Sequence, residues 1–358
     1  MLMTSAKKLH DRQPAAAERI DYLDAAKGIF IIFIIMGHHL LGADSFVRYL
    51  YSMGVTPFFL ITGFLCAYKN EWEQPMGKNA AKKVRKLLYP FLTFSVIILL
   101  WNVLYYKVVF TDQVPEYSLR AMLIYTVSTY GYNALWYLPC VFWGTLLFFA
   151  LRRTKHHDLL WAVLTLGFLT FYFLFDKKLT GLGIVSKIYC YLFRVGAATV
   201  LLYGGSLLFR VFRSMNKSRE NLLLLICAAF SAVIAVLYQL YPEQFPLANL
   251  ATHRIGNPYV YCLTAVSNTT VILLLCKKLL KRSRVLTYFG RNSLVLMALH
   301  MDVTGRIGWW LFPKLHISFG ETLNSIIVIA LELLMFPVII TVINKWFPFI
   351  LSPKKVKN

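Results

Sequence analysis

Long apolar runs separated by short basic segments constrain the fold of this chain more than any other feature of its sequence. The runs have about 16–23 residues, close to the roughly 20 that a helix needs to cross a hydrocarbon core about 30 Å thick. Of the 358 residues, 58% are hydrophobic and only 15% are charged, too few to cover a soluble domain of this length. The sequence therefore predicts an all-α, polytopic transmembrane bundle.

We expect about ten membrane spans. They are residues 28–43, 51–68, 87–109, 134–151, 159–175, 188–209, 221–240, 259–276, 293–312 and 323–343. A less polar segment at about 118–130 is expected to form an interfacial helix before the fourth span. Aromatic residues are frequent at the ends of the runs, where their rings form belts at membrane interfaces.

The distribution of Lys and Arg predicts the orientation, because cytoplasmic connections are enriched in these residues. With the N-terminus inside, the cytoplasmic segments carry 26 Lys and Arg and the opposite connections carry 8. Both termini are then cytoplasmic, in a multi-pass protein of the cell (inner) membrane. We predict a cytoplasmic tail at 1–18, a transmembrane domain at 19–350 and a second cytoplasmic tail at 351–358.

The net charge of +22 raises the question of nucleic acid. The basic clusters alternate with apolar runs, as membrane topology requires, and do not form a face that tracks phosphates, so we expect membrane lipid and no nucleic acid as a partner. The six cysteines lie in or beside apolar runs, without metal or disulfide spacing. His38-His39 and His156-His157 lack the i, i+4 spacing of helical metal ligands, so no metal is expected.

Ionisable side chains inside the predicted spans are candidates for function, because burying them in a membrane is costly. They are His38, His39, Arg194, His300, Asp302 and Glu332. None belongs to a soluble enzyme motif, since the chain has no P-loop, no dinucleotide-binding fingerprint, no Gly-x-Ser-x-Gly elbow and no His-Glu-x-x-His.

The first span carries the most specific pattern, in which Lys27 precedes His38 by eleven residues. At 100° and 1.5 Å per residue, the two side chains share one helix face to within about 20° and differ in depth by roughly 16 Å. A ligand with an anionic head and a long arm ending in a reactive group fits this spacing, and acyl-CoA is such a molecule. A neutral imidazole in the membrane is suited to act as general base on a hydroxyl. In the purely structural interpretation, His38 bonds a neighbouring helix and Lys27 anchors the topology.

A basic loop is predicted at Lys78–Tyr89, before Pro90 and the third span. Its cations are Lys78, Lys82, Lys83, Arg85 and Lys86. Such a cluster fixes topology or attracts anionic lipid, and it equally suits the phosphates of a nucleotide-bearing donor.

A third pattern begins at Gly290 and leads to His300. Asn292 or Ser293 suits a helix start, and His300 then lies about 10 Å into the span. It would approach the level of His38 if the first and ninth spans are neighbours, although a single membrane histidine is more often structural. Asp302 points to a different helix face and is not expected to orient His300.

In their order along the chain, these patterns resemble membrane-bound acyltransferase family 3. The matching segments are Arg19-Ile-Asp-Tyr-Leu-Asp-Ala-Ala-Lys-Gly28, Gly37-His38, Pro57-Phe-Phe-Leu-Ile-Thr-Gly-Phe-Leu65, Lys82-Lys-Val-Arg-Lys-Leu-Leu-Tyr-Pro90, Leu135-Trp-Tyr-Leu138 and Gly290-x-Asn-Ser-Leu294 with His300. Thr62 replaces the usual Ser of the third segment. The Leu-Asp-Ala-Ala-Lys-Gly form is similar to the branch that includes fucose O-acetylase-like proteins.

The resemblance implies that His38 is the catalytic histidine and that Lys27 fills the position of a family Arg or Lys. The cluster at 82–86 resembles the Arg-x-x-Arg element expected at the acyl-CoA phosphates, with Lys82/Arg85 and Lys83/Lys86 both open as its register. Some relatives append an extracellular hydrolase-like domain. We expect this chain either to act alone or to pass the acyl group to a separate extracytoplasmic acyl acceptor protein.

Together these inferences predict an inner-membrane O-acyltransferase that moves an acyl group, expected to be acetyl, from cytoplasmic acyl-CoA (acetyl-CoA) to a hydroxyl of a cell-surface polysaccharide or glycolipid. His38 would deprotonate the acceptor or relay the acyl group. The predicted donor-binding residues are Lys27, Lys82, Lys83, Arg85 and Lys86, and the acceptor-side candidates are His39, Arg194, His300 and Asp302.

Two alternatives remain at this point. A multipass transporter or lipid-linked-sugar flippase would move its substrate without consuming acyl-CoA, but it is expected to carry broken helices in two repeated halves, and no internal repeat is evident. The other large membrane acyltransferase family has a late key histidine, as His300 is, but leaves the Lys27–His38 pattern unexplained.

Overall fold

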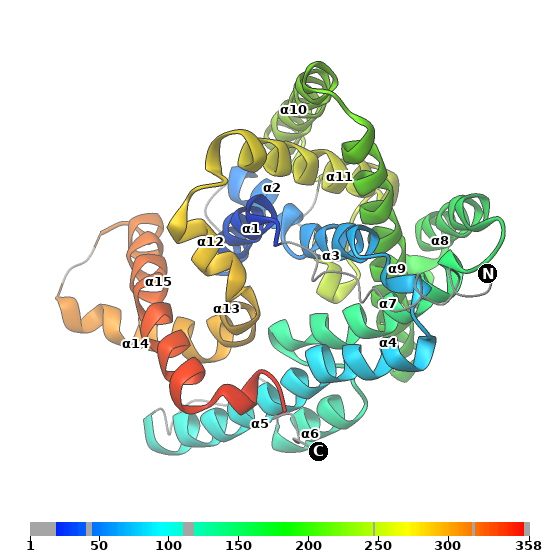
Figure 1. The fold of residues 1–358 in the computed structure, drawn as a ribbon. Coiled ribbons are helices and arrows are strands. Elements are labelled where there is room, and N and C mark those ends of the chain that lie inside the picture. Colours follow the sequence, from blue (N-terminus) through cyan, green and yellow to red (C-terminus); the bar gives the residue numbers. More distant parts are fainter. Residues whose placement is uncertain (1–18, 41–44, 110–117, 246–247, 317–318, 354–358) are drawn as a thin grey trace, which may run out of the picture.

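The computed structural model describes residues 19–40, 45–109, 118–245, 248–316 and 319–353. In these residues the chain is a bundle of helices, and the extended pairing in them is one isolated bridge between Asn249 and Arg254. Figure 1 shows α1 in the interior of the bundle, with α8 and α10 at its periphery. The predicted all-α polytopic fold is confirmed. The predicted tail at 1–18 and residues 354–358 of the second tail lie outside the described residues.

Short connections join the helices, and four π-helical turns extend them. The helices are α1 (Asp21–His39), α2 (Ser45–Met53), α3 (Thr56–Tyr68), α4 (Met76–Lys83), α5 (Tyr89–Leu104), α6 (Leu119–Val127), α7 (Tyr137–Arg152), α8 (His157–Leu179), α9 (Ile184–Ser214), α10 (Lys217–Leu240), α11 (Pro258–Leu275), α12 (Arg284–Arg291), α13 (Ser293–Leu299), α14 (Arg306–Leu311) and α15 (Glu321–Trp346). The π-helical turns are Val84–Leu88, Tyr105–Val109, Cys276–Leu280 and His300–Gly305.

Eight helical stretches in the described residues are long and apolar enough to cross a membrane, and they coincide with eight of the ten predicted spans. They are Val47–Tyr68, Met76–Lys107, Asn133–Arg152, His157–Leu179, Ile184–Ser214, Lys217–Leu240, Pro258–Leu280 and Glu321–Trp346. The other two predicted spans, 28–43 and 293–312, fall on α1, whose first turns are charged, and on α13–α14, which the turn His300–Gly305 interrupts. Ten spans with both termini cytoplasmic therefore stays a prediction. The expected helix near 118–130 is present as α6.

The basic segment Lys78–Tyr89 is helical, so its prediction as a loop was wrong. Alanine, lysine, arginine and leucine all favour helix, and the segment runs from α4 into α5 without a break. Pro90 would normally end such a helix, because its ring clashes with the carbonyl four residues earlier. The wider turn Val84–Leu88 lies at this place and accommodates the proline.

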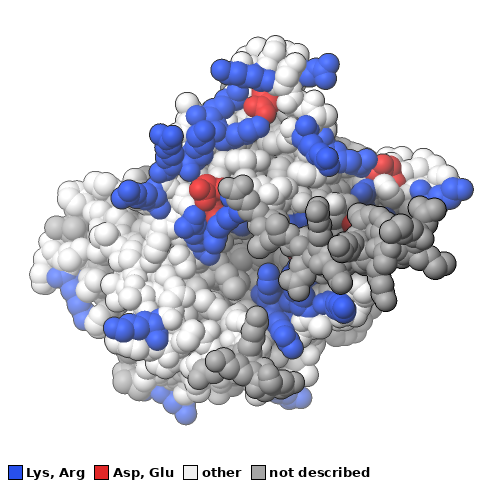
Figure 2. Space-filling view, viewed as in Figure 1, with Lys and Arg blue, Asp and Glu red and all other residues white. Residues whose placement is uncertain are grey.

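The connections that were predicted to be cytoplasmic gather at one end of the bundle, where ion pairs join them. Lys277 pairs with Glu220 of α10, and Arg291 of α12 lies 3.0 Å from Asp21 of α1. We call this the basic end. Figure 2 shows the face on which Lys and Arg side chains gather over α10, α12 and α4, with few acidic residues among them. The cytoplasmic location of this end stays a prediction.

The buried core surrounds α1, α3 and α9. Phe30 and Ile31 of α1 and Phe59 of α3 have no exposed surface. At the periphery, only 11% of the most apolar stretch of α8 and of α10 is buried within the protein. Helices whose apolar side chains face outward all round are expected where lipid is the solvent.

α1 and α12 are in backbone contact at two glycines. A Cβ atom added to Gly28 would lie 2.1 Å from the carbonyl oxygen of Leu286, and one added to Gly290 would lie 1.7 Å from that of Asp24. Small residues allow this approach between membrane helices. α3 and α9 make the same reciprocal contact through Gly63 and Gly205. The two glycine contacts fix the central helices relative to each other.

We expect Gly28→Ala and Gly290→Ala to lower the thermal stability of the detergent-solubilised protein, by about 1–3 kcal/mol or more in unfolding free energy, because a backbone carbonyl has to move. Gly167→Ala is the matched control. Gly167 lies inside α8 with nothing within 4 Å of an added Cβ, and alanine favours helix by up to about 1 kcal/mol relative to glycine. Equal changes in melting temperature for all three variants would contradict the close contact.

Candidate active site

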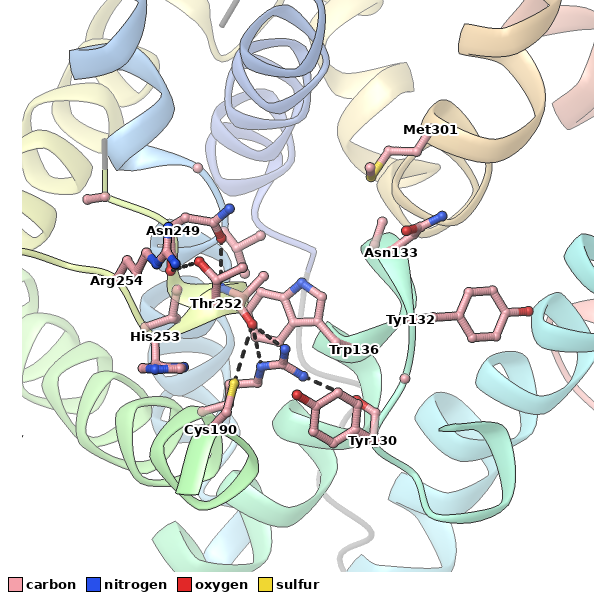
Figure 3. A pocket seen from close by; sticks show the side chains of 18 of the residues that line it. Tyr130, Tyr132, Asn133, Trp136, Cys190, Asn249, Thr252, His253, Arg254 and Met301 are labelled. Atoms are coloured by element: carbon pink, nitrogen blue, oxygen red, sulfur yellow. Dashed lines mark hydrogen bonds between the residues drawn. The ribbon is translucent and has the colours of Figure 1, made fainter. Parts of the chain in front are cut away.

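A cavity of about 680 Å³ lies at the end of α1 that is opposite to the basic end. Its walls come from the last turns of α1, the end of α2 and its connection to α3, the connection before α7, the start of α9, the connection before α11 and the start of the turn His300–Gly305. Figure 3 shows the cavity between the loop that carries Asn249 and His253 and the segment that carries Asn133 and Trp136. In the predicted topology this is the extracytoplasmic side.

His38 and His300 lie side by side at the cavity wall, with their ring centroids 5.0 Å apart. His38 is in the last turn of α1, and His300 opens the π-helical turn that follows α13. The ring of Tyr51 packs edge-on against His38 at 5.4 Å. The first and ninth predicted spans are therefore neighbours, as the approach of the two histidines requires.

His300 is buried, and its surroundings select one tautomer of the neutral ring. Nδ1 lies 3.1 Å from the carbonyl oxygen of Leu296 and 2.9 Å from that of Met297. Carbonyl oxygens only accept hydrogen bonds, so Nδ1 carries the proton and Nε2 offers a lone pair. Nε2 is buried and has no hydrogen-bond partner in the described residues. A bound molecule that donates a hydrogen bond would satisfy it.

His38 is half-buried and lines the same cavity. Its ring contacts in the described residues are with Tyr51 and His300, and no described residue forms a hydrogen bond with it. Its nitrogens are therefore available to a ligand in the cavity. A histidine held by ring packing alone retains the freedom to take up and release a proton.

His39 does not line the cavity, although it was an acceptor-side candidate. Its Nε2 lies 2.7 Å from Oε2 of Glu332 in α15, and its Nδ1 accepts a hydrogen bond from Nε1 of Trp309. Because Nδ1 accepts a hydrogen bond, Nε2 carries the proton of the neutral ring and donates a hydrogen bond to the carboxylate. Thr304 donates to the other oxygen of Glu332. His39 and Glu332 thus connect the end of α1 to α15 and to the turn His300–Gly305.

Asp302, also an acceptor-side candidate, is buried behind the cavity wall and does not line it. Its Oδ1 accepts hydrogen bonds from Nδ2 of Asn133 at 2.8 Å and from Arg306 at 3.2 Å. Asn133 itself lines the cavity. The carboxylate therefore holds the segment before α7 against the turn that carries His300.

Arg194, another acceptor-side candidate, lines the cavity. Its guanidinium donates to the backbone carbonyl oxygens of Ala251 and Tyr130 and lies over the rings of Tyr130 and Trp136, 4.6 and 5.2 Å from their centroids. It is buried, with 6% of its surface exposed, and forms no ion pair with a described residue. The charge is held by carbonyl dipoles and aromatic faces.

Sequence reasoning missed several cavity residues. Trp136 belongs to the Leu135–Leu138 segment, which was read only as part of the resemblance, and Lys187 and Arg254 are among the few cations of the Lys-poor side. The motif around Trp136 and the rare cations on the Lys-poor side could both have been used to predict cavity residues. Tyr51 is one of 21 tyrosines, and nothing in its local sequence marks it.

Lys27 lies at the basic end of α1 and does not line the cavity. Its Nζ is 3.4 Å from Oδ1 of Asp24, and the same carboxylate lies 2.6 Å from Arg19 and 3.5 Å from Arg291. α1 is unbroken from Asp21 to His39, so Lys27 and His38 stand on one helix as expected. The two residues share the helix α1, but only His38 lines the cavity.

The predicted donor cluster at 82–86 divides into two pairs. Lys82 and Lys83 each lie 2.8 Å from an oxygen of Glu71. Burial alone raises the pKa of the Glu71 carboxyl, but Lys83 and Lys82 outweigh burial and lower this pKa to about 2. Arg85 and Lys86 are exposed and form no ion pair with a described residue, so they are the cations of this cluster that remain free for phosphates.

A family model for the acyltransferase domain called acyltransferase 3 matches residues 20–351. The chain belongs to the acyltransferase 3 family. Neither a curated protein nor a solved structure matches it. The match runs from the residue before α1 to the residue after the last described helical turn, so both histidines of the cavity and the basic end belong to the family domain.

This acyltransferase 3 protein is therefore a multi-pass membrane acyltransferase. In its described residues, no group of three or more His, Cys, Asp or Glu side chains is arranged to hold a metal ion. Its cysteines are free thiols, and all but Cys262 are buried. The histidines among the described residues that line the cavity are His38, His253 and His300.

We expect the Glu71 cluster to stabilise this acyltransferase less as the pH falls. The pKa of Glu71 is lowered from 4.5 to about 2 on folding, so its contribution is complete above pH 4.5 and is lost as the pH falls toward 2. The difference in unfolding free energy between wild type and Glu71→Gln should be on the order of 2–3 kcal/mol above that window and shrink within it. Glu73→Gln is the control, because Glu73 is an exposed neighbour that forms no ion pair with a described residue, and an identical pH profile for both variants would contradict the pairing.

Proposed function

We propose that this protein is an O-acyltransferase of the cell (inner) membrane that moves an acetyl group from cytoplasmic acetyl-CoA to a hydroxyl of a surface polysaccharide or glycolipid. The observation that carries the proposal is the pair of imidazoles, His38 and His300, at 5.0 Å in a cavity of about 680 Å³. Transfer to a hydroxyl needs a base beside a site that admits the acceptor, and a cavity of this size admits a saccharide.

In the proposed reaction, neutral His38 takes the proton of the acceptor hydroxyl as its oxygen attacks the thioester carbonyl carbon. A C–O bond forms, the C–S bond breaks, and the sulfur leaves as the CoA thiolate. The thiolate takes the proton from His38, which regenerates the neutral base. Nε2 of His300, which lacks a partner in the described residues, accepts a hydrogen bond from another hydroxyl and orients the acceptor.

On the donor side, we propose that the exposed Arg85 and Lys86 bind the phosphates of CoA, with Lys27 nearby at the basic end. Guanidinium groups suit bidentate contacts with phosphate. Lys27 does not line the cavity, but Ile34 of the same helix does. The proposal therefore requires the acyl arm to enter along α1 over these seven residues, about 10 Å of helix.

The product leaves on the extracytoplasmic side in this proposal, because the cavity lies at the end of α1 opposite to the basic end. The acyl group passes either directly to the glycan or through a separate extracytoplasmic acyl acceptor protein. Direct transfer needs the two histidines, the acceptor hydroxyl and the thioester of the donor together in the cavity.

We expect His38→Ala to reduce acetyl transfer by at least a hundredfold, because general-base catalysis contributes about 10²–10⁴-fold. The assay follows CoA release by the purified protein in lipid vesicles with acetyl-CoA and candidate glycans. His156→Ala is the matched control, since His156 is exposed in the connection before α8 at the basic end, and it should retain wild-type activity.

Normal ester formation by a folded His38→Ala protein would remove the mechanism. Glycan movement across the vesicle membrane without CoA release, unchanged by His38→Ala, would favour a transporter instead.

We expect the double variant Arg85→Ala/Lys86→Ala to raise the KM for acetyl-CoA about tenfold or more with little change in kcat. Phosphate contacts distant from the reacting carbon contribute uniform binding, which affects KM alone. Lys155→Ala, an exposed cation in another connection of the basic end, is the control. An unchanged KM in the double variant would show that the donor does not use this cluster.

A further inference from the structure

The charged residues of the cavity wall are all cations. Lys187, Arg194 and Arg254 line it, and none of its described lining residues is Asp or Glu. Asp176, an acidic residue of the neighbouring α8, lies outside the lining, where its carboxylate is 3.7 Å from His253 and accepts a hydrogen bond from Tyr189. The cavity therefore presents positive charge without a matching carboxylate in the described residues.

Arg194 provides the buried part of this charge. It donates three hydrogen bonds to two neutral carbonyl oxygens, those of Ala251 and Tyr130, which leaves two of the five N–H groups of a guanidinium unused. A buried cation without an opposite charge attracts an anion strongly, because the surroundings screen it poorly.

Lys187 and Arg254 provide the exposed part, at the mouth. Both side chains are exposed, and neither forms an ion pair with a described residue. They come from different elements: Lys187 from the first turn of α9, and Arg254 from the loop before α11, where its backbone pairs with Asn249. A cleft lined by charges of one sign focuses the field and attracts substrates of opposite charge.

Aromatic rings lie beside these cations. The rings of Tyr125 and Tyr130 have centroids 5.0 Å apart, and Nζ of Lys187 lies 5.6 Å from the centroid of Tyr125. Aromatic faces with a few placed polar groups are typical of small-molecule sites, and the C–H face of a sugar packs well on such rings. Positive charge next to aromatic faces suits an acidic sugar.

We infer that the acceptor of this acyltransferase is an acidic saccharide, whose carboxylate or phosphate binds Lys187, Arg254 and Arg194 while a hydroxyl of the sugar reaches His38. The inference rests on the proposed function and deepens it by naming the class of acceptor. The anionic group and the reacting hydroxyl belong to one molecule, so the charge orients the hydroxyl as well as binding it.

The test is a binding measurement without acyl-CoA, made on His38→Ala protein in lipid nanodiscs by isothermal titration. The probes are an oligosaccharide of galacturonic acid, its carboxyl-reduced neutral counterpart, and that neutral oligosaccharide carrying a phosphate monoester. At least one acidic probe should bind tenfold or more tightly than the neutral one, and its advantage should fall as salt is added. The two acidic probes distinguish a carboxylate from a phosphate.

Lys187→Ala and Arg254→Ala, added singly to the same protein, should each weaken binding of the preferred acidic probe about tenfold, the loss expected for a charge-assisted hydrogen bond. Lys314→Ala is the matched control, because Lys314 is an exposed cation outside the cavity lining. The inference is overturned if all three probes bind equally, if neither acidic probe binds at millimolar concentration, or if the preference survives in the Lys187→Ala/Arg254→Ala double variant. CoA release is measured separately, so failure of the transferase reaction and failure of the acidic preference remain distinct results.

Discussion

The backbone contact between α1 and α12 determines where the other functional groups of this acyltransferase lie. Gly28 and Gly290 lack Cβ atoms, so the two helices approach until backbone meets backbone. α13 continues from α12 along α1, and the contact at one end of α1 therefore brings His300 to His38 at the other. His38 and His300, about 260 positions apart in the chain, form one site because Gly28 and Gly290 have no side chains to keep the helices apart.

The two ends of the bundle treat positive charge differently. At the basic end, Glu71 pairs with Lys82 and Lys83, and Asp24 with Lys27, so that much of the charge serves to hold connections together. At the cavity, Arg194 is held by neutral carbonyl oxygens. A cation in an ion pair is neutralised at long range by its partner and mainly stabilises the fold. A cation that only neutral dipoles surround keeps its long-range field. At the cavity, the electrostatic field of Arg194 therefore remains available to attract a substrate.

Hydropathy alone predicted the helices that lie against lipid, because their length and composition follow from the membrane itself. It placed His38 in the first span and His300 in the ninth, but it left open whether these spans are neighbours. The prediction of a loop at Lys78–Tyr89 was wrong, because no local sequence pattern indicates that a π-helical turn allows the helix to continue through Pro90. Ligand-facing and structural roles within His38-His39 could not be told apart either, since the distinction depends on Glu332 and Trp309, which come from the far end of the chain.

The turn His300–Gly305 uses more residues per revolution than the helices on either side of it, so it sets the rotational phase of everything that follows. The turn also contains Asp302, whose carboxylate accepts a hydrogen bond from Asn133, and Thr304, whose hydroxyl donates one to Glu332. If the same residues formed a regular α-helix instead, they would turn further about the axis, and the side chains that follow would be rotated relative to those that precede. Helical content would then be preserved while the cavity wall changed, which makes the wider winding of this segment as much a part of the site as the identity of its histidine.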